Sequence, residues 1–78
     1  MFTVYVLKDI SGKLYKGMTN NLERRLKEHR SGHTITTSKM KEFSVVYTEN
    51  YDNFAEAREK EVYLKSAAGR RFLKDKIN

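Results

Sequence analysis

Polar side chains occupy the apolar face of a segment that is predicted to form a helix beginning near Leu22. Successive helical residues lie about 100° apart, so residues three or four positions apart share a face. Arg25 and His29 therefore lie on the same face as Leu26, whereas Arg24 points away. An arginine can bind a phosphate or a carboxylate through two hydrogen bonds, and a histidine titrates near neutral pH. This face is a candidate site for chemistry.

A second predicted helix, beginning at Phe54, carries a carboxylate on its apolar face. Glu61 shares that face with Ala57 and Leu64, while Glu59 lies outside it. A lone carboxylate among apolar groups is costly unless it is paired, protonated or bound to a metal ion. The alternative to a functional role is an internal salt bridge between Arg25 and Glu61.

Two tyrosines in the N-terminal hairpin are further candidates. Along the first strand Tyr5 shares a face with Leu7, and along the second strand Tyr15 shares a face with Gly17. Because Gly17 has no side chain, another group or a ligand backbone can approach closely there. Considered singly, each tyrosine is more often structural, since aromatic residues pack well in half-buried strands.

These candidates are positioned by a short series of elements without repeats or linkers. Asp9 and Gly12 suit the first and fourth positions of a type I turn, Asn20 with Glu23 can begin the first helix, and Gly69 is predicted to break the second. Asp52 or Asn53 is the expected cap of that second helix. The predicted strands are Phe2 to Leu7, Lys13 to Met18 and Phe43 to Thr48, and the predicted helices run from the Asn20 cap to about Arg30, from Phe54 to about Ser66 and from Arg70 to Ile77, with a mobile loop over 33–41.

The resulting order is β-β-α-β-α-α, which places the chain in the α/β class in its α+β form. A hairpin at the start and no β-α-β-α alternation predict a three-stranded, mostly antiparallel sheet with flanking helices. Seventy-eight residues suffice for one small domain, 1–78, and not for two.

Charge is unevenly distributed along the chain. The formal net charge is +6, with a net of +6 over residues 1–41, −4 over 42–64 and +4 over 65–78. Basic surfaces attract polyphosphates, although small proteins also carry such charge for solubility. The absence of cysteine excludes disulfides and thiolate metal sites, and no apolar stretch is long enough for a transmembrane helix or a signal peptide. We therefore expect a cytoplasmic protein without membrane contact.

The candidate residues together resemble the GIY-YIG nuclease superfamily, and most closely its small stand-alone bacterial branch. Val4-Tyr5-Val6 stands where the family has GIY, and Tyr15-Lys16-Gly17 stands where it has YIG. The stretch YKGMTNNLERRLKEHRSG resembles the Arg-bearing helix of that branch, and AREKEVYLKSAAGRRFLK resembles its second signature. The first motif departs from the family by lacking Gly and Ile, and the second departs at Lys16, where an apolar residue is usual.

The resemblance implies an excision-repair nuclease-like endonuclease that hydrolyses DNA phosphodiester bonds. The implied catalytic residues are Tyr5 as general base, Tyr15, Arg25 and His29, with Glu61 as the ligand of one Mg²⁺ or Mn²⁺ ion. The resemblance is also compatible with an enzyme that recognises a particular DNA structure and acts in repair or recombination. Because no separate binding domain remains, a protein partner or a targeting subunit is compatible with the sequence.

Several residues are predicted to contact the DNA backbone. For any single one of them, a solvated surface position without a role in binding is the favoured interpretation. Thr19 either contacts the phosphate or helps to start the first helix. The predicted cationic contacts are Arg24, Lys27, Arg30, Lys39, Lys41, Arg70, Arg71 and Lys74. Two alternatives stay open: a non-catalytic nucleic-acid-binding module on the same fold, and a protein-interaction domain whose inward polar groups form only a buried salt-bridge network.

Overall fold

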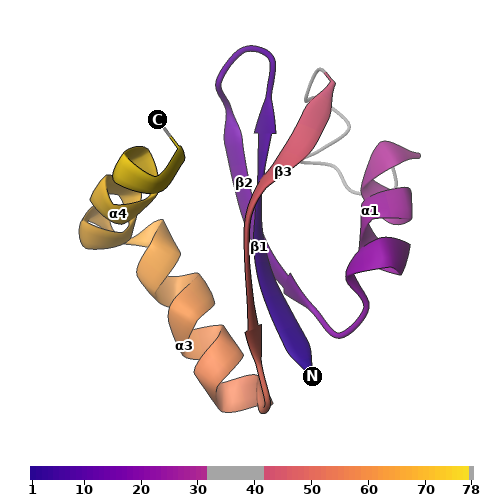
Figure 1. Ribbon diagram of the computed structural model, residues 1–78, viewed down its shortest axis with the longest axis vertical. Coiled ribbons are helices and arrows are strands. Elements are labelled where there is room, and N and C mark those ends of the chain that lie inside the picture. Colours follow the sequence, from indigo (N-terminus) through magenta and orange to yellow (C-terminus); the bar gives the residue numbers. More distant parts are fainter. Residues whose placement is uncertain (32–41, 78) are drawn as a thin grey trace.

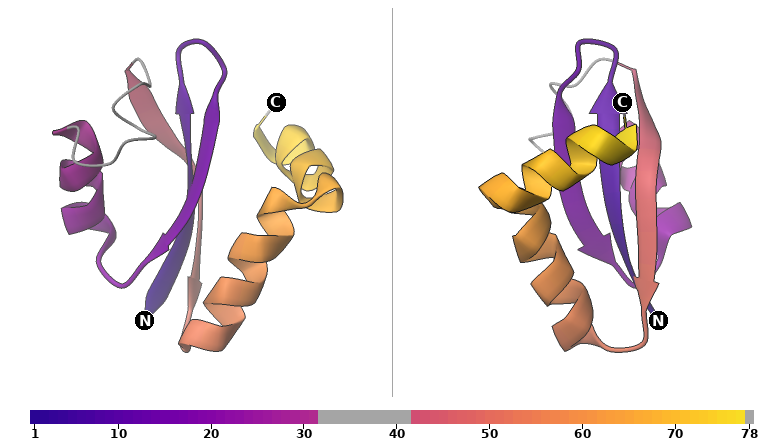
Figure 2. Two further views of the ribbon diagram at one scale, coloured as in Figure 1. Left: turned by 180° about the vertical axis from the view of Figure 1, so that it is seen from behind. Right: turned by 60° about the vertical axis from the view of Figure 1, so that its left-hand side comes forward.

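The computed structural model describes residues 1–31 and 42–77 and confirms the α+β fold. Its three strands pair antiparallel in the order β2-β1-β3. Helix α1 covers one face of the sheet, and α3 and α4 cover the other (Figures 1 and 2). The elements are β1 (Phe2–Asp9), β2 (Leu14–Thr19), α1 (Leu22–Arg30), β3 (Phe43–Tyr51), α3 (Phe54–Lys65) and α4 (Ala67–Ile77).

The turn between β1 and β2 has the chemistry predicted for it. The backbone N–H of Gly12 donates to the carbonyl of Asp9 at 3.0 Å, and Gly12 has a φ of 91°, which glycine adopts without steric penalty. The Asp9 carboxylate also accepts from the backbone N–H groups of Ser11 (3.0 Å) and Lys13 (2.8 Å). These bonds fix the register that brings Tyr5 opposite Gly17.

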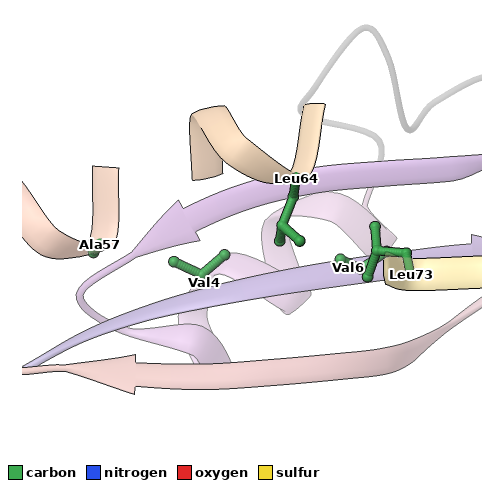
Figure 3. Packing of buried hydrophobic residues seen from close by; sticks show 5 residues of the cluster. All are labelled: Val4, Val6, Ala57, Leu64 and Leu73. Atoms are coloured by element: carbon green, nitrogen blue, oxygen red, sulfur yellow. The ribbon is translucent and has the colours of Figure 1, made fainter. Parts of the chain in front are cut away.

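Strand β1 is the centre of the sheet and is buried on both faces. Val4 and Val6 point to the side of α3 and α4, where they form the main apolar core with Ala57, Leu64 and Leu73 (Figure 3). All five side chains are fully buried, and burial of one such Val or Leu side chain contributes roughly 1.5–3 kcal/mol. Tyr5 and Leu7, on the alternate positions, are equally buried beneath the other face.

Asparagine side chains cap the N-termini of α1 and α3. The predicted Asn20 cap is wrong by one residue, because the side chain of Asn21 accepts from the backbone N–H of Arg24 at 3.0 Å. Asn20 instead accepts from the Arg24 guanidinium at 3.3 Å. Of the two caps considered for α3, the structure selects Asn53, which accepts from the N–H of Glu56 at 2.9 Å.

Gly69 does not break a helix, contrary to the prediction. The chain turns at Ser66, which has an extended backbone (φ −81°, ψ 168°), and α4 is already formed at Ala67. Gly69 is buried within α4, where an added Cβ would lie 2.5 Å from the Cα of Leu64. The glycine is therefore required by the close approach of α4 to α3 and not by a change of direction.

The predicted loop over 33–41 and the candidate contacts Lys39 and Lys41 lie outside the described residues. Within the described ranges, 1–31 and 42–77, no helix has the length and apolar character needed to span a membrane.

Candidate active site

Tyr5 lies at the centre of the sheet face that α1 covers. It pairs across the hairpin with Gly17, and Tyr15 pairs with Leu7, so both tyrosines point to this face. A Cβ at position 17 would lie 2.6 Å from the Tyr5 hydroxyl and 3.0 Å from the Tyr15 ring. The close approach inferred at Gly17 is therefore made by the two tyrosines of the site.

His29 reaches the same place from the last turn of α1. Its Nε2 lies 2.8 Å from the hydroxyl oxygen of Tyr5 in a buried hydrogen bond, and only 1% of the residue is exposed. The imidazole also packs edge-on against Tyr15 (4.9 Å between ring centroids) and Phe43 (6.3 Å). The burial predicted for His29 from helical spacing is confirmed.

Arg25, one helical turn before His29, adds a cation to the tyrosine pair. Its guanidinium forms a half-exposed ion pair with Glu28 at 3.0 Å. Hydrogen bonding to Glu28, and then to Tyr5, raises the pKa of Arg25, with a smaller effect from Tyr15. Glu28 was not singled out from the sequence, although its position three residues after Arg25 on a helix is the spacing of an ion pair.

Burial and charge determine the protonation states in this cluster. Burial raises the pKa of Tyr5 to about 12, and the opposing hydrogen bond from Arg25 is the smaller effect. Burial, followed by the positive charge of Arg25, lowers the pKa of His29 below its ordinary value of 6.5. At neutral pH the site therefore holds a phenol beside an uncharged imidazole, and in the tautomer with a free Nε2 lone pair Tyr5 donates to His29.

Glu61 comes from α3, on the other face of the sheet. It is only 8% exposed, as its position among apolar residues predicted. Its carboxylate pairs with Arg58 at 2.8 Å and Lys65 at 3.3 Å. Across residues 1–31 and 42–77 no salt bridge joins Glu61 to Arg25, so the alternative of an internal pair between them is wrong.

The carboxylate of Glu61 is the one predicted metal ligand. A Mg²⁺ ion commonly binds one or two protein carboxylates and completes its shell with water and substrate oxygens. The part of the chain that the structure describes contains no group of three His, Cys, Asp or Glu residues suited to enclose a metal ion. Because the side chains of Arg58 and Lys65 are 57% and 53% exposed, both can move away from Glu61 without being buried elsewhere. The donor set fits a hydrated ion and not a closed metal cage.

The profile of the GIY-YIG catalytic domain matches residues 1–76. The chain belongs to the GIY-YIG catalytic domain family. Tyr5, Tyr15 and Gly17, which the sequence resemblance places in its two name-giving motifs, all lie on the sheet face beside α1. Two of the residues predicted from the resemblance, Tyr5 and His29, are joined by a hydrogen bond in the structure.

Similar proteins include bacterial UPF0213 proteins. A UPF0213 protein of Clostridium perfringens is 40% identical over 63 residues, covering 80% of this chain and 68% of its own. A UPF0213 protein of Bacillus licheniformis is 33% identical over 76 residues, covering 92% of this chain and 78% of its own. The solution NMR structure of a UPF0213 protein from Bacillus halodurans superposes with a TM-score of 0.59 at 30% identity, covering 96% of this chain and 84% of that one.

The remaining predicted contacts of the GIY-YIG domain are spread over both faces of the sheet. Arg24, Lys27 and Arg30 are exposed on α1, with Lys27 4.0 Å from Glu23. The predicted contacts on α4, which lies across the sheet, are also exposed: Arg70, Arg71 and Lys74. The buried Thr19 hydroxyl accepts from the backbone N–H of Asn21 at 3.1 Å, which agrees with a role in starting α1.

Proposed function

We propose that this GIY-YIG domain is a metal-dependent endonuclease that hydrolyses DNA phosphodiester bonds. The observation that carries the proposal is the buried hydrogen bond between the Tyr5 hydroxyl and His29 Nε2, with Arg25 beside it. A proton acceptor chain next to a fixed cation is what attack on a phosphate requires. A purely structural tyrosine does not need a neutral histidine buried against its hydroxyl.

In the proposed reaction Arg25 binds two oxygens of the scissile phosphate and stabilises the charge that develops on them. Tyr5 accepts a proton from the attacking water while it passes its own hydroxyl proton to His29 Nε2, so the phenolate never has to exist free. The raised pKa of Tyr5 disfavours a phenolate in the resting enzyme, and the simultaneous transfer of both protons avoids that species. The water oxygen then bonds to phosphorus as the bond to the leaving 3′ oxygen breaks, and that oxygen takes a proton from solvent to become a hydroxyl. Tyr15 positions the water or the phosphate.

Glu61 is the residue that would hold the divalent ion, Mg²⁺ or Mn²⁺. Such an ion supplies Lewis-acid polarisation of a phosphate oxygen and favours departure of the 3′ oxygen. The cationic residues of α1 and α4 would contact the backbone of the DNA without reading its sequence. A structure-specific DNA substrate in repair or recombination, a cytoplasmic location and a protein partner remain part of the proposal.

The direct test is cleavage of supercoiled plasmid and of flap or branched DNA with Mg²⁺, with Mn²⁺ and with EDTA. We expect cleavage with either ion and none with EDTA. Salt-sensitive DNA binding without cleavage under any of these conditions would instead support the non-catalytic binding module. Neither cleavage nor binding would mean that the inward polar groups serve the fold alone.

We also predict how cleavage depends on pH. His29 must be uncharged to accept a proton, and its pKa lies below 6.5, so kcat/KM should rise as pH increases through that pKa and level off by about pH 7. Because the pKa of Tyr5 is about 12, no second rise is expected in the range of about pH 7 to 10. The measurement is kcat/KM against pH for wild type and His29→Gln, whose profile should lose the acidic step. A wild-type rise centred above pH 8 would contradict the relay.

A further inference from the structure

A groove with a positive rim lies between the β1–β2 hairpin and α4. Its volume is about 230 Å³, and its lining is Lys8, Gly12, Leu14, Arg70, Leu73, Lys74 and Ile77. Three of these residues are cations, none is acidic, and three others provide an apolar floor. Arg70 and Lys74 lie one helical turn apart, which places both side chains on the same face of α4.

Lys16 adds to this concentration of charge from strand β2. It alternates with Tyr15 and Gly17, so its side chain faces the layer of α3 and α4. Burial, then the positive charges of Arg70 and Lys65, lower the pKa of Lys16. The half-buried Lys16 ammonium therefore lies near other positive charges. The second family motif usually has an apolar residue at this position.

Among the described residues, these cations form no ion pair with an acid. In the part of the chain that the structure describes, no salt bridge reaches Lys8, Lys16, Arg70 or Lys74. Like charges placed together without counter-charges destabilise a fold, and an apolar residue at position 16 would relieve the repulsion. The arrangement is explained if an anionic ligand supplies the missing charge.

The edge strand β2 connects these cations to the candidate active site. Tyr15 and Lys16 are neighbours in sequence on opposite faces of β2, which is an edge strand of the sheet formed by residues 1–31 and 42–77. In the right-hand view of Figure 2 the junction of α3 and α4 lies on the β2 side of the sheet, and α3 contacts β2. A chain of phosphates that passes around this edge meets Arg25 on one face and the cations on the other.

We propose that Lys8, Lys16, Arg70 and Lys74, here named the basic groove, bind the phosphodiester backbone of DNA that continues from the scissile phosphate across the edge of β2. This inference rests on the proposed nuclease function and extends it, because it gives the substrate a second contact surface on the far face of the sheet. The three lysine ammonium groups act as point charges, the Arg70 guanidinium suits bidentate contact with a phosphate, and the groove lining contains no Asn or Gln side chain that would read bases. The contact is therefore independent of sequence.

The test compares wild type with Lys16→Gln, Arg70→Gln, Lys74→Gln and the triple variant. Duplex DNA binding is measured by fluorescence anisotropy in EDTA over a series of salt concentrations, and cleavage is measured with Mg²⁺. Each substitution should reduce the slope of log Kd against log salt by about 1. The triple variant should bind at least about tenfold more weakly at low salt, with KM raised and kcat unchanged. Lys76→Gln, which removes one charge from α4 outside the groove, should change neither.

Misfolding is separated from lost contacts by thermal melting. Relief of like-charge repulsion should raise the Tm of Lys16→Gln by a few degrees while its DNA binding weakens. A triple variant that retains the wild-type affinity and salt slope, while wild type cleaves DNA, would overturn the basic groove and leave the nuclease function standing. A triple variant that loses only binding to poly-glutamate would identify an acidic protein as the ligand instead. A wild-type protein that neither binds nor cuts DNA would overturn both proposals.

Discussion

Substitution of Arg25 by alanine is expected to reduce kcat/KM for DNA cleavage by about three orders of magnitude. The guanidinium is the one cation of the described site that affects both Tyr5 and the charge on His29. Its loss removes the hydrogen bond that opposes the rise in the pKa of Tyr5. It also removes the donor that would stabilise the charge of the transition state. The measurement is single-turnover cleavage of a labelled duplex with saturating Mg²⁺.

Two further variants test whether the geometry of Arg25 matters and not only its charge. Arg25→Lys keeps a cation but loses the planar pair of donors. We therefore expect its cleavage rate to be less than about a tenth of the wild-type rate. Arg24→Ala changes the neighbouring exposed arginine of the same helix and should alter the salt dependence of binding without abolishing cleavage. Arg25→Ala protein with the wild-type Tm and the wild-type rate would contradict the proposed mechanism.

The face of each candidate residue could be predicted from the sequence because helical and strand periodicities are local properties. Helical spacing placed His29 and Glu61 on the core-facing sides of their helices, and both residues are buried. Strand alternation placed Tyr5 with Leu7 on one strand and Tyr15 with Gly17 on the other, and the hairpin register brings these two pairs to the same face. These inferences required no knowledge of how the elements pack.

Tertiary packing determined what the sequence could not show. Glycine is a residue type that often ends helices. Gly69 nevertheless lies within α4, because the backbone of α3 is too close to leave room for a side chain there. The apolar face of a helix also does not indicate which side of the sheet that helix covers, so an ion pair between Arg25 and Glu61 was compatible with the sequence. The structure places α1 and α3 on opposite faces of the sheet (Figure 1). The raised pKa of Tyr5 likewise depends on tertiary packing, because it results from burial and from Arg25 of α1 and Tyr15 of β2.

Substitution of Glu61 by glutamine is expected to abolish metal-dependent cleavage, with a loss of about 10³-fold or more, while DNA binding is retained. Glutamine preserves the size of the side chain and can still accept from Arg58 and Lys65, so the packing of α3 should survive. It removes the negative charge that a hard divalent ion requires. A titration with Mn²⁺ followed by calorimetry gives a readout that is independent of activity, and the variant should lose the binding heat seen with wild type.

Glu59→Gln is the matched control for Glu61→Gln, because Glu59 is an exposed glutamate on the same helix, two residues earlier. The control should cleave DNA and bind Mn²⁺ as wild type does. If Glu61→Gln melts at the wild-type temperature yet retains cleavage with the same requirement for Mg²⁺, the ion must be held elsewhere. The carboxylate would then serve only its pairs with Arg58 and Lys65. If the variant loses both Mn²⁺ binding and cleavage but not DNA affinity, α3 supplies the metal ligand. A residue from one face of the sheet would then act with the Tyr5–His29 pair from the other, across the edge of β2.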